Sequence, residues 1–220
     1  MDAFVIRGGR RLRGTLAVHG SKNATLPLMA ASLLTDQPLK LHHVPDLADI
    51  RNLGRLLESL GVEVDRVAED RTVRLASDPG APVLAAYDIV RTMRASICVL
   101  GPLLARRGRA KVSMPGGCNI GDRPVDLHLR GLRAMGAEIH LDSGYIVAEA
   151  PGGGRLRGET IFLGGPFGST VLGTANIMSA ATLAEGTTVI ESAACEPEVV
   201  DLAKLLTAMG AKITGAGSPR

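Results

Sequence analysis

Three short segments of this 220-residue chain are near copies of one another, and their spacing limits the folds that the chain can adopt. Each segment places a glycine between a helical apolar run and an extended run, and these glycines are Gly61, Gly136 and Gly210. They lie 75 and 74 residues apart (136 minus 61, 210 minus 136). A fixed period of this kind is typical of repeated supersecondary units. The sequence therefore predicts three copies of one unit.

Each copy follows the same order of elements. An apolar helical run is followed by a strand, a loop, a second helix, the glycine and another strand. The glycine comes directly after the last apolar helix position, where a left-handed C-terminal cap needs no Cβ. The predicted first helices are 26–34, 97–104 and 177–183, the strands after them 39–41, 110–112 and 188–190, and the second helices 50–60, 127–135 and 199–209.

The third copy differs from the other two after its glycine. The first two continue as a strand, a turn and a returning strand over 62–75 and 137–148. The third begins a strand at 211–213 but reaches residue 220 with no returning strand, so we expect a chain cut from something longer, with an unpaired edge strand. The repeats span about 21–80, 84–150 and 156–220, the last of them truncated.

The composition allows a sizeable core and argues against nucleic-acid binding. Hydrophobic residues make up 45% of the chain and aromatic residues 2%, so the core must consist of aliphatic side chains and methionine. The net charge is only +3, and the basic run 106–109 lacks the interleaved aromatic residues of a single-strand binder. Small anionic ligands fit this charge better than nucleic acid does.

The sequence gives no signal for a membrane span, a metal ion or a cofactor. No apolar run approaches membrane-spanning length, and the N-terminus does not resemble a signal peptide, so we expect a cytoplasmic protein. The five histidines show no metal-ligand spacing, and His128 is expected to pack on its helix rather than to catalyse. No P-loop or dinucleotide-binding fingerprint is present, which disfavours nucleotide hydrolysis and hydride transfer.

The three cysteines have different surroundings in the sequence. Their odd number and wide separation argue against a disulfide framework. Cys98 lies in an apolar run and is expected in the core, whereas Cys195 lies in a polar turn and has no evident role. Cys118 lies among three glycines in the loop 115–123, which ends on Arg123.

The Cys118 loop can be interpreted in two ways. Its glycine-rich backbone is able to close over a ligand, carrying a thiol to a reacting atom and a guanidinium to an anion. Alternatively, it is a surface turn whose cysteine is incidental, since free cysteines are usually inert. The second copy has 32 residues from its first helix to its glycine (136 minus 104), against 27 and 26 in the others (61 minus 34, 210 minus 184). Because the surplus falls in this loop, the active-site interpretation is favoured.

Several motifs together resemble one family of enolpyruvyl transferases, the UDP-N-acetylglucosamine 1-carboxyvinyltransferases. They are Ser21-Lys22-Asn23-Ala24, Arg91-Thr92-Met93-Arg94-Ala95-Ser96, Pro115-Gly116-Gly117-Cys118, Arg123-Pro124-Val125-Asp126-Leu127-His128 and Leu183-Ala184-Glu185-Gly186-Thr187-Thr188. The resemblance covers the whole chain. It implies an α/β (α+β) fold, an inside-out α/β barrel lobe of three βαβαββ repeats with helices inside and sheets outside. It also implies that residues 21–220 are one lobe of a two-lobed enzyme and that residues 1–20 are a strand segment that packs with the second lobe.

The resemblance implies an activity and a role for each site residue. The activity is transfer of the enolpyruvyl group of phosphoenolpyruvate to the 3-hydroxyl of UDP-N-acetylglucosamine, in peptidoglycan precursor synthesis. Cys118 resembles the proton donor, which can form an adduct with substrate and is the target of fosfomycin. Lys22, Asn23 and Arg123 resemble the phosphoenolpyruvate ligands. The implied UDP-N-acetylglucosamine ligands are Arg94, Arg123, Pro124, Val125, Asp126, Leu127, Gly168, Ser169, Thr170 and Val171.

Two functional groups of the resembled family have no counterpart in these 220 residues. The aspartate that takes the hydroxyl proton and a further arginine come from the second lobe. One interpretation is therefore half of an enolpyruvyl transferase that is inactive alone. The alternative is a single lobe that binds a sugar nucleotide or a partner without turnover. An enolpyruvylshikimate phosphate synthase shares the repeated fold but lacks the cysteine loop and is disfavoured.

Overall fold

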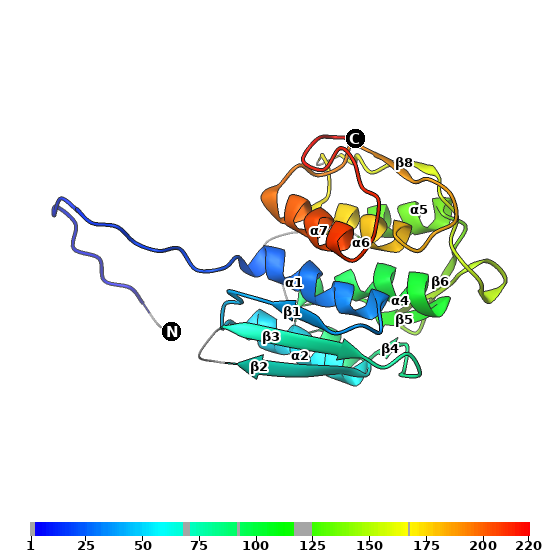
Figure 1. Cartoon of the computed structure of the whole chain (residues 1–220), viewed down its shortest axis with the longest axis horizontal. Coiled ribbons are helices and arrows are strands. Elements are labelled where there is room, and N and C mark those ends of the chain that lie inside the picture. Colours follow the sequence, from blue (N-terminus) through cyan, green and yellow to red (C-terminus); the bar gives the residue numbers. More distant parts are fainter. Residues whose placement is uncertain (1–2, 68–70, 92, 117–124, 167) are drawn as a thin grey trace.

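The computed structural model describes residues 3–67, 71–91, 93–116, 125–166 and 168–220. It confirms the predicted order of elements in the first two units and, as far as the second helix, in the third (Figure 1). The first unit consists of α1 (Lys22–Ala30), η1 (Ala31–Leu34), β1 (Leu39–Leu41), α2 (Ala48–Ser59), β2 (Val62–Val67) and β3 (Thr72–Ser77). The second unit consists of β4 (Leu84–Ala85), α3 (Tyr87–Val90), η2 (Arg94–Val99), α4 (Leu100–Arg107), β5 (Arg109–Ser113), α5 (Asp126–Ala134), β6 (Glu138–Asp142) and β7 (Tyr145–Glu149). The third consists of η3 (Pro151–Gly153), β8 (Thr160–Phe162), α6 (Val171–Ala181), β9 (Val189–Glu191) and α7 (Pro197–Ala208).

The strands of each unit form a separate sheet. The strand orders are β1-β3-β2, β4-β5-β7-β6 and β8-β9. In the first two sheets the returning strand lies in the middle and pairs antiparallel on both sides, as β3 does with β1 and β2. The pairs β4-β5 and β8-β9 are parallel, as expected when a helix connects them.

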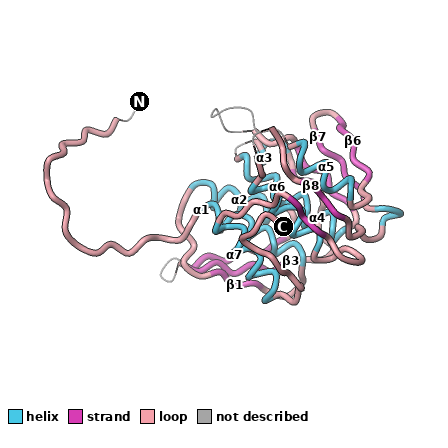
Figure 2. The backbone as a smooth tube through the Cα atoms, turned by 90° about the horizontal axis from the view of Figure 1, so that it is seen from above, coloured by secondary structure: helices cyan, strands magenta, loops and turns pink. Residues whose placement is uncertain are grey.

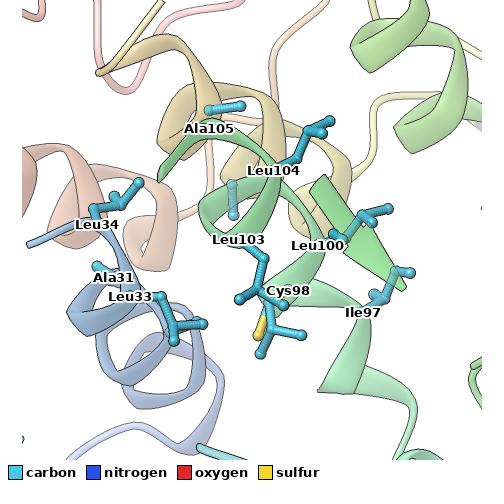
Figure 3. Close-up of a cluster of buried hydrophobic side chains, with 14 of the residues drawn as sticks. Ala31, Leu33, Leu34, Ile97, Cys98, Leu100, Leu103, Leu104 and Ala105 are labelled. Atoms are coloured by element: carbon cyan, nitrogen blue, oxygen red, sulfur yellow. The ribbon is translucent and has the colours of Figure 1, made fainter. Parts of the chain in front are cut away.

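The apolar helices α1–η1, η2–α4 and α6, called the first helices of the three units, lie inside, and the sheets lie outside, as the fold prediction requires. In α6, every residue from Gly173 to Ala180 is buried, whereas four of the five residues of β6 are exposed. A helix that is apolar on all sides is stable only when neighbours cover it completely. Figure 3 shows how side chains of η1, such as Leu33, and of α4, such as Leu103, point toward one another in this central layer.

The first helices of units one and two run parallel, so that their N-termini lie at the same end. The evidence is that α1 contacts η2 while η1, which continues α1, contacts α4. At this contact the Cys98 thiol donates to the Leu26 carbonyl, with sulfur and oxygen 3.9 Å apart. Cys98 is buried, and burial raises its pKa to about 12, which confirms it as a core residue.

The strand expected at 211–213 is wrong. These residues form no ladder with any strand of the described chain. In the first two units the strand after the glycine pairs with the returning strand, and no described segment takes that place in the third. Instead, a cavity of about 730 Å³ lies between β9 and the segment 211–214.

The N-terminal segment 3–18 extends away from the rest of the chain (Figures 1 and 2), which it joins at His19, where the imidazole Nδ1 contacts the Arg71 guanidinium. Its large apolar side chains are almost fully exposed, including Phe4 at 98% and Val18 at 94%. A segment with this many exposed apolar side chains is unusual on the surface of a folded protein. That it packs with a second lobe stays a prediction.

Candidate active site

Lys22 and Asn23 lie in the first turn of α1, at the end that it shares with η2. The helix begins there because Ser21 caps it, its Oγ accepting from the Ala24 amide at 3.3 Å. Lys22 Nζ lies 2.8 Å from Asp49 Oδ2, in the first turn of α2. An ammonium at a helix N-terminus is unfavourable unless an anion balances it. Asp49 supplies that charge, while 43% of the Lys22 side chain stays accessible to a ligand.

Arg94 is the first residue of η2, and its positive charge lowers the pKa of His128 in α5. His128 is buried, and its pKa is lowered to about 4, first by burial and then by the Arg94 charge, against an opposing effect of Asp126. At neutral pH the imidazole is therefore uncharged. Its Nδ1 accepts from the Asn176 amide at 2.8 Å, so the ring proton lies on Nε2. His128 packs as the sequence predicted, and its location places the start of α5 beside η2.

Two of the segments predicted to bind the sugar nucleotide are neighbours. Val125 is buried, Asp126 is exposed and Leu127 is half-buried at the start of α5. A Cβ on Gly165 would lie 3.2 Å from Leu127 Cδ1, so this side chain contacts the turn that leads to Gly168. The segment before α6 therefore lies beside the start of α5.

The turn before α6 presents backbone groups to solvent. Gly165 and Gly168 each donate to the other's carbonyl at 2.9 and 3.0 Å. Gly168 has a φ of +88°, which favours glycine, and both Gly168 and Ser169 are exposed. Thr170 then caps α6, its Oγ1 accepting from the Gly173 amide at 3.2 Å. Val171 is the first residue of α6, so the predicted segment ends on a helix N-terminus, which suits an anion.

Cys118, Arg123 and Pro124 lie outside the described residues, and their roles stay predictions. The described chain that precedes them lies against Arg91, the residue that follows α3. A Cβ on Gly116 would lie 2.8 Å from the Arg91 carbonyl oxygen, so only a glycine fits there. The chain thus enters the cysteine loop beside the segment that carries Arg94.

The sequence analysis missed two residues of this region, Asp49 and Asn176. Asp49 is one of several acidic residues in first turns of helices, and only the tertiary structure pairs it with Lys22. Asn176 had a usable signal, because it is a lone amide in the apolar helix α6. In the described part of the chain, no three His, Cys, Asp or Glu side chains gather as metal ligands, and no helix has the length and apolarity to cross a membrane.

The helical layer, its three outer sheets and the cations at the helix N-termini define the class as one lobe of the enolpyruvyl transferase fold. The enolpyruvyl transferase NikO from Streptomyces tendae superposes with a TM-score of 0.76 at 22% identity, covering 96% of this chain and 48% of that one. EPSP synthase from Acinetobacter baumannii superposes with a TM-score of 0.71 at 18% identity, covering 93% and 45%. At these identities the likeness concerns the fold.

Sequence comparison identifies the family. The family model described as EPSP synthase (3-phosphoshikimate 1-carboxyvinyltransferase) matches residues 6–220, and the chain belongs to this family. Within it, the chain is 57% identical to the UDP-N-acetylglucosamine 1-carboxyvinyltransferase of Maricaulis maris (strain MCS10) and 55% identical to that of Methylacidiphilum infernorum (isolate V4). Each alignment covers 99% of this chain and 50% of the relative. The chain thus spans about half the length of the curated relatives that it matches.

Proposed function

We propose that this chain is the N-terminal lobe of a cytoplasmic enzyme that transfers the enolpyruvyl group of phosphoenolpyruvate to the 3-hydroxyl of UDP-N-acetylglucosamine, releasing phosphate. This is the first committed step of peptidoglycan precursor synthesis. The observation that carries the proposal is the accessible Lys22 ammonium at the N-terminus of α1, at the same end as Arg94. Two cations and a helix N-terminus at one end of the packed helices suit ligands with several negative charges.

The sugar nucleotide is proposed as acceptor because the relatives at 52–57% identity are UDP-N-acetylglucosamine 1-carboxyvinyltransferases. In this proposal, Arg94 and the two neighbouring segments 125–127 and 168–171 bind the nucleotide. Arg123 and Pro124 belong to the same set. Lys22 and Asn23, together with Arg123, bind phosphoenolpyruvate.

The chemistry divides between this lobe and a second one. Cys118 donates a proton to the enol carbon of phosphoenolpyruvate, and the acceptor hydroxyl attacks the neighbouring carbon. A base from the second lobe takes the hydroxyl proton, which gives a tetrahedral intermediate. The methyl carbon of this intermediate then returns a proton to the Cys118 thiolate as phosphate leaves, and the double bond of the enolpyruvyl ether forms. Lys22 and Arg123 stabilise the negative charge on the phosphate throughout.

The test uses the full-length protein, meaning this chain continued to the length of its relatives. Phosphate release from phosphoenolpyruvate should require UDP-N-acetylglucosamine. Release at an equal rate with shikimate 3-phosphate in its place would refute the acceptor. In the same assay Lys22→Met should lower the rate. Its matched control is Lys204→Met, which removes a surface lysine that pairs with its helix neighbour Asp201 and should leave the rate unchanged.

A further inference from the structure

Asn176 is a buried amide whose side chain makes three hydrogen bonds to other elements. It is 1% exposed and lies in the middle of the apolar helix α6. Its Oδ1 accepts from the Gly101 amide at 2.8 Å, and its Nδ2 donates to the Ile97 carbonyl at 2.9 Å and to His128 Nδ1 at 2.8 Å. A buried amide satisfied in this way fixes its neighbours, because each lost bond would leave a polar group unpaired.

These three bonds reach the elements that carry the predicted sugar-nucleotide segments. Ile97 belongs to η2, which begins at Arg94. His128 belongs to the first turn of α5, directly after the segment 125–127. Asn176 itself belongs to α6, which begins at the end of the segment 168–171. The Asn176 side chain therefore links η2, α5 and α6, the elements that carry Arg94 and the segments 125–127 and 168–171.

The packing around Asn176 leaves little room for adjustment. A Cβ on Gly101 would lie 2.3 Å from the backbone carbonyl oxygen of Asn176 and 2.8 Å from its side-chain Oδ1, so α4 touches both the backbone and the side chain of Asn176. Likewise, a Cβ on Gly131 of α5 would lie 2.6 Å from Ile177 Cδ1. Since α4 and α5 both pack closely on α6 here, a changed side chain at position 176 must move at least one of them.

We infer that Asn176 is a positioning residue for the sugar nucleotide. Within the described residues, the three hydrogen bonds of its side chain go to residues outside the predicted ligand set, and it acts by holding η2, α5 and α6 at fixed relative positions. The phosphoenolpyruvate residues Lys22 and Asn23 lie on α1, to which the Asn176 side chain is not bonded in the described structure. The inference rests on the proposed function. It predicts that a change at Asn176 raises the KM for UDP-N-acetylglucosamine and leaves the KM for phosphoenolpyruvate nearly unchanged.

The experiment compares two variants of the full-length enzyme that remove hydrogen bonds from α6 and keep the number and branching of side-chain heavy atoms. Asn176→Leu removes the three bonds described above. Thr174→Val is the matched control, because Thr174 is also buried on α6 and its Oγ1 accepts from the Ala194 amide at 3.0 Å, away from the predicted ligand segments. Both variants should lower the melting temperature. Kinetics are measured well below it for both substrates.

For Asn176→Leu, we expect the KM for UDP-N-acetylglucosamine to rise about tenfold or more, while the KM for phosphoenolpyruvate stays within about twofold, because misplaced supports weaken only the ligand that they hold. Thr174→Val should change neither KM. A merely structural role for Asn176 would lower the active fraction and leave both KM values unchanged, or raise both together, and either result would overturn the inference.

Two further arms keep the test decisive. If Asn176→Leu does not fold, Asn176→Asp retains the acceptor for the Gly101 amide and can no longer donate to the Ile97 carbonyl of η2. Because the bond to η2 is lost, the same selective rise in KM is expected. Unchanged KM values in a folded Asn176→Asp enzyme would also overturn the inference. Failure of the proposed function is recognised separately, because the wild-type enzyme would then release no phosphate with UDP-N-acetylglucosamine.

Discussion

Lys22 Nζ and Asp49 Oδ2 lie 2.8 Å apart and join the N-termini of α1 and α2. The pair is partly exposed, so it contributes little to stability, about 0–1 kcal/mol. Its importance is to place an ammonium, still open to solvent, at the site predicted for phosphoenolpyruvate.

Lys22→Met should therefore weaken phosphoenolpyruvate binding while leaving the fold intact. Loss of a charge-assisted bond to an anion corresponds to a KM increase of roughly 10- to 100-fold. The measurement is steady-state kinetics of the full-length enzyme together with urea unfolding. Asp49→Asn is the control, since it breaks the same ion pair but keeps the cation. Equal KM increases in the two variants would show that the ion pair matters rather than the ammonium.

His128 should make the fold less stable as the pH falls. Its pKa is about 4 in the folded chain, against an ordinary value of 6.5, so below pH 6.5 the unfolded chain binds a proton that the folded chain does not. As far as His128 is concerned, the free energy of unfolding is highest above pH 6.5. It falls by on the order of 3 kcal/mol in total as the pH drops from 6.5 toward 4.

The measurement for His128 is urea unfolding at a series of pH values between these limits. In His128→Gln this part of the pH dependence should disappear, and the remaining slope should come from carboxyl groups. Identical pH dependence in the wild-type and variant chains would contradict the buried neutral imidazole.

The three thiols should differ in reactivity. Cys98 is buried with its pKa raised to about 12 and should not react in the folded chain, whereas Cys195 is exposed and should react slowly. We predict that Cys118 reacts first. In the full-length enzyme, fosfomycin should label Cys118, and faster with sugar nucleotide bound.

Cys118→Asp tests the thiol prediction further, because a carboxyl group can donate a proton but is a poor nucleophile toward an epoxide. This variant should keep activity and lose the labelling. Mass spectrometry that finds the adduct on Cys98 or Cys195 would refute the role of Cys118.

The 220-residue chain alone should not turn over. In the proposed reaction a second lobe supplies the base for the acceptor hydroxyl and closes the cleft, and general base catalysis alone is worth typically about 10²- to 10⁴-fold in rate. Phosphate release by the purified chain is compared with release by the full-length enzyme. Comparable rates would show that a second lobe is dispensable or that two copies of this chain supply it to each other.

Much of the fold was predictable because its signals are local. The glycines Gly61, Gly136 and Gly210 gave the period, and the predicted helices and strands lie close to the observed ones. The strand at 211–213 failed because strand formation depends on a partner elsewhere in the chain. The 3-10 segment η2 was also missed as a separate element, since an apolar run does not distinguish it from α4.

Residues of the candidate site were predictable only where they belong to a sequence motif. Lys22 and Arg94 were found by resemblance, whereas the residues that hold this region together were not. Asp49 is 27 positions from its partner Lys22 (49 minus 22), and Asn176 is 48 positions from His128 and 79 from Ile97. Contacts over such separations are set by how the helices pack, and no local pattern encodes them.

The sharpest test of the proposed reaction is to identify the product when the full-length enzyme chooses between two acceptors. Phosphoenolpyruvate is supplied with equal amounts of UDP-N-acetylglucosamine and shikimate 3-phosphate, and mass spectrometry determines which acceptor carries the enolpyruvyl ether. We predict that UDP-N-acetylglucosamine carries it and that shikimate 3-phosphate is recovered unchanged. Enolpyruvyl ether on shikimate 3-phosphate, or on neither acceptor, would contradict the proposed reaction.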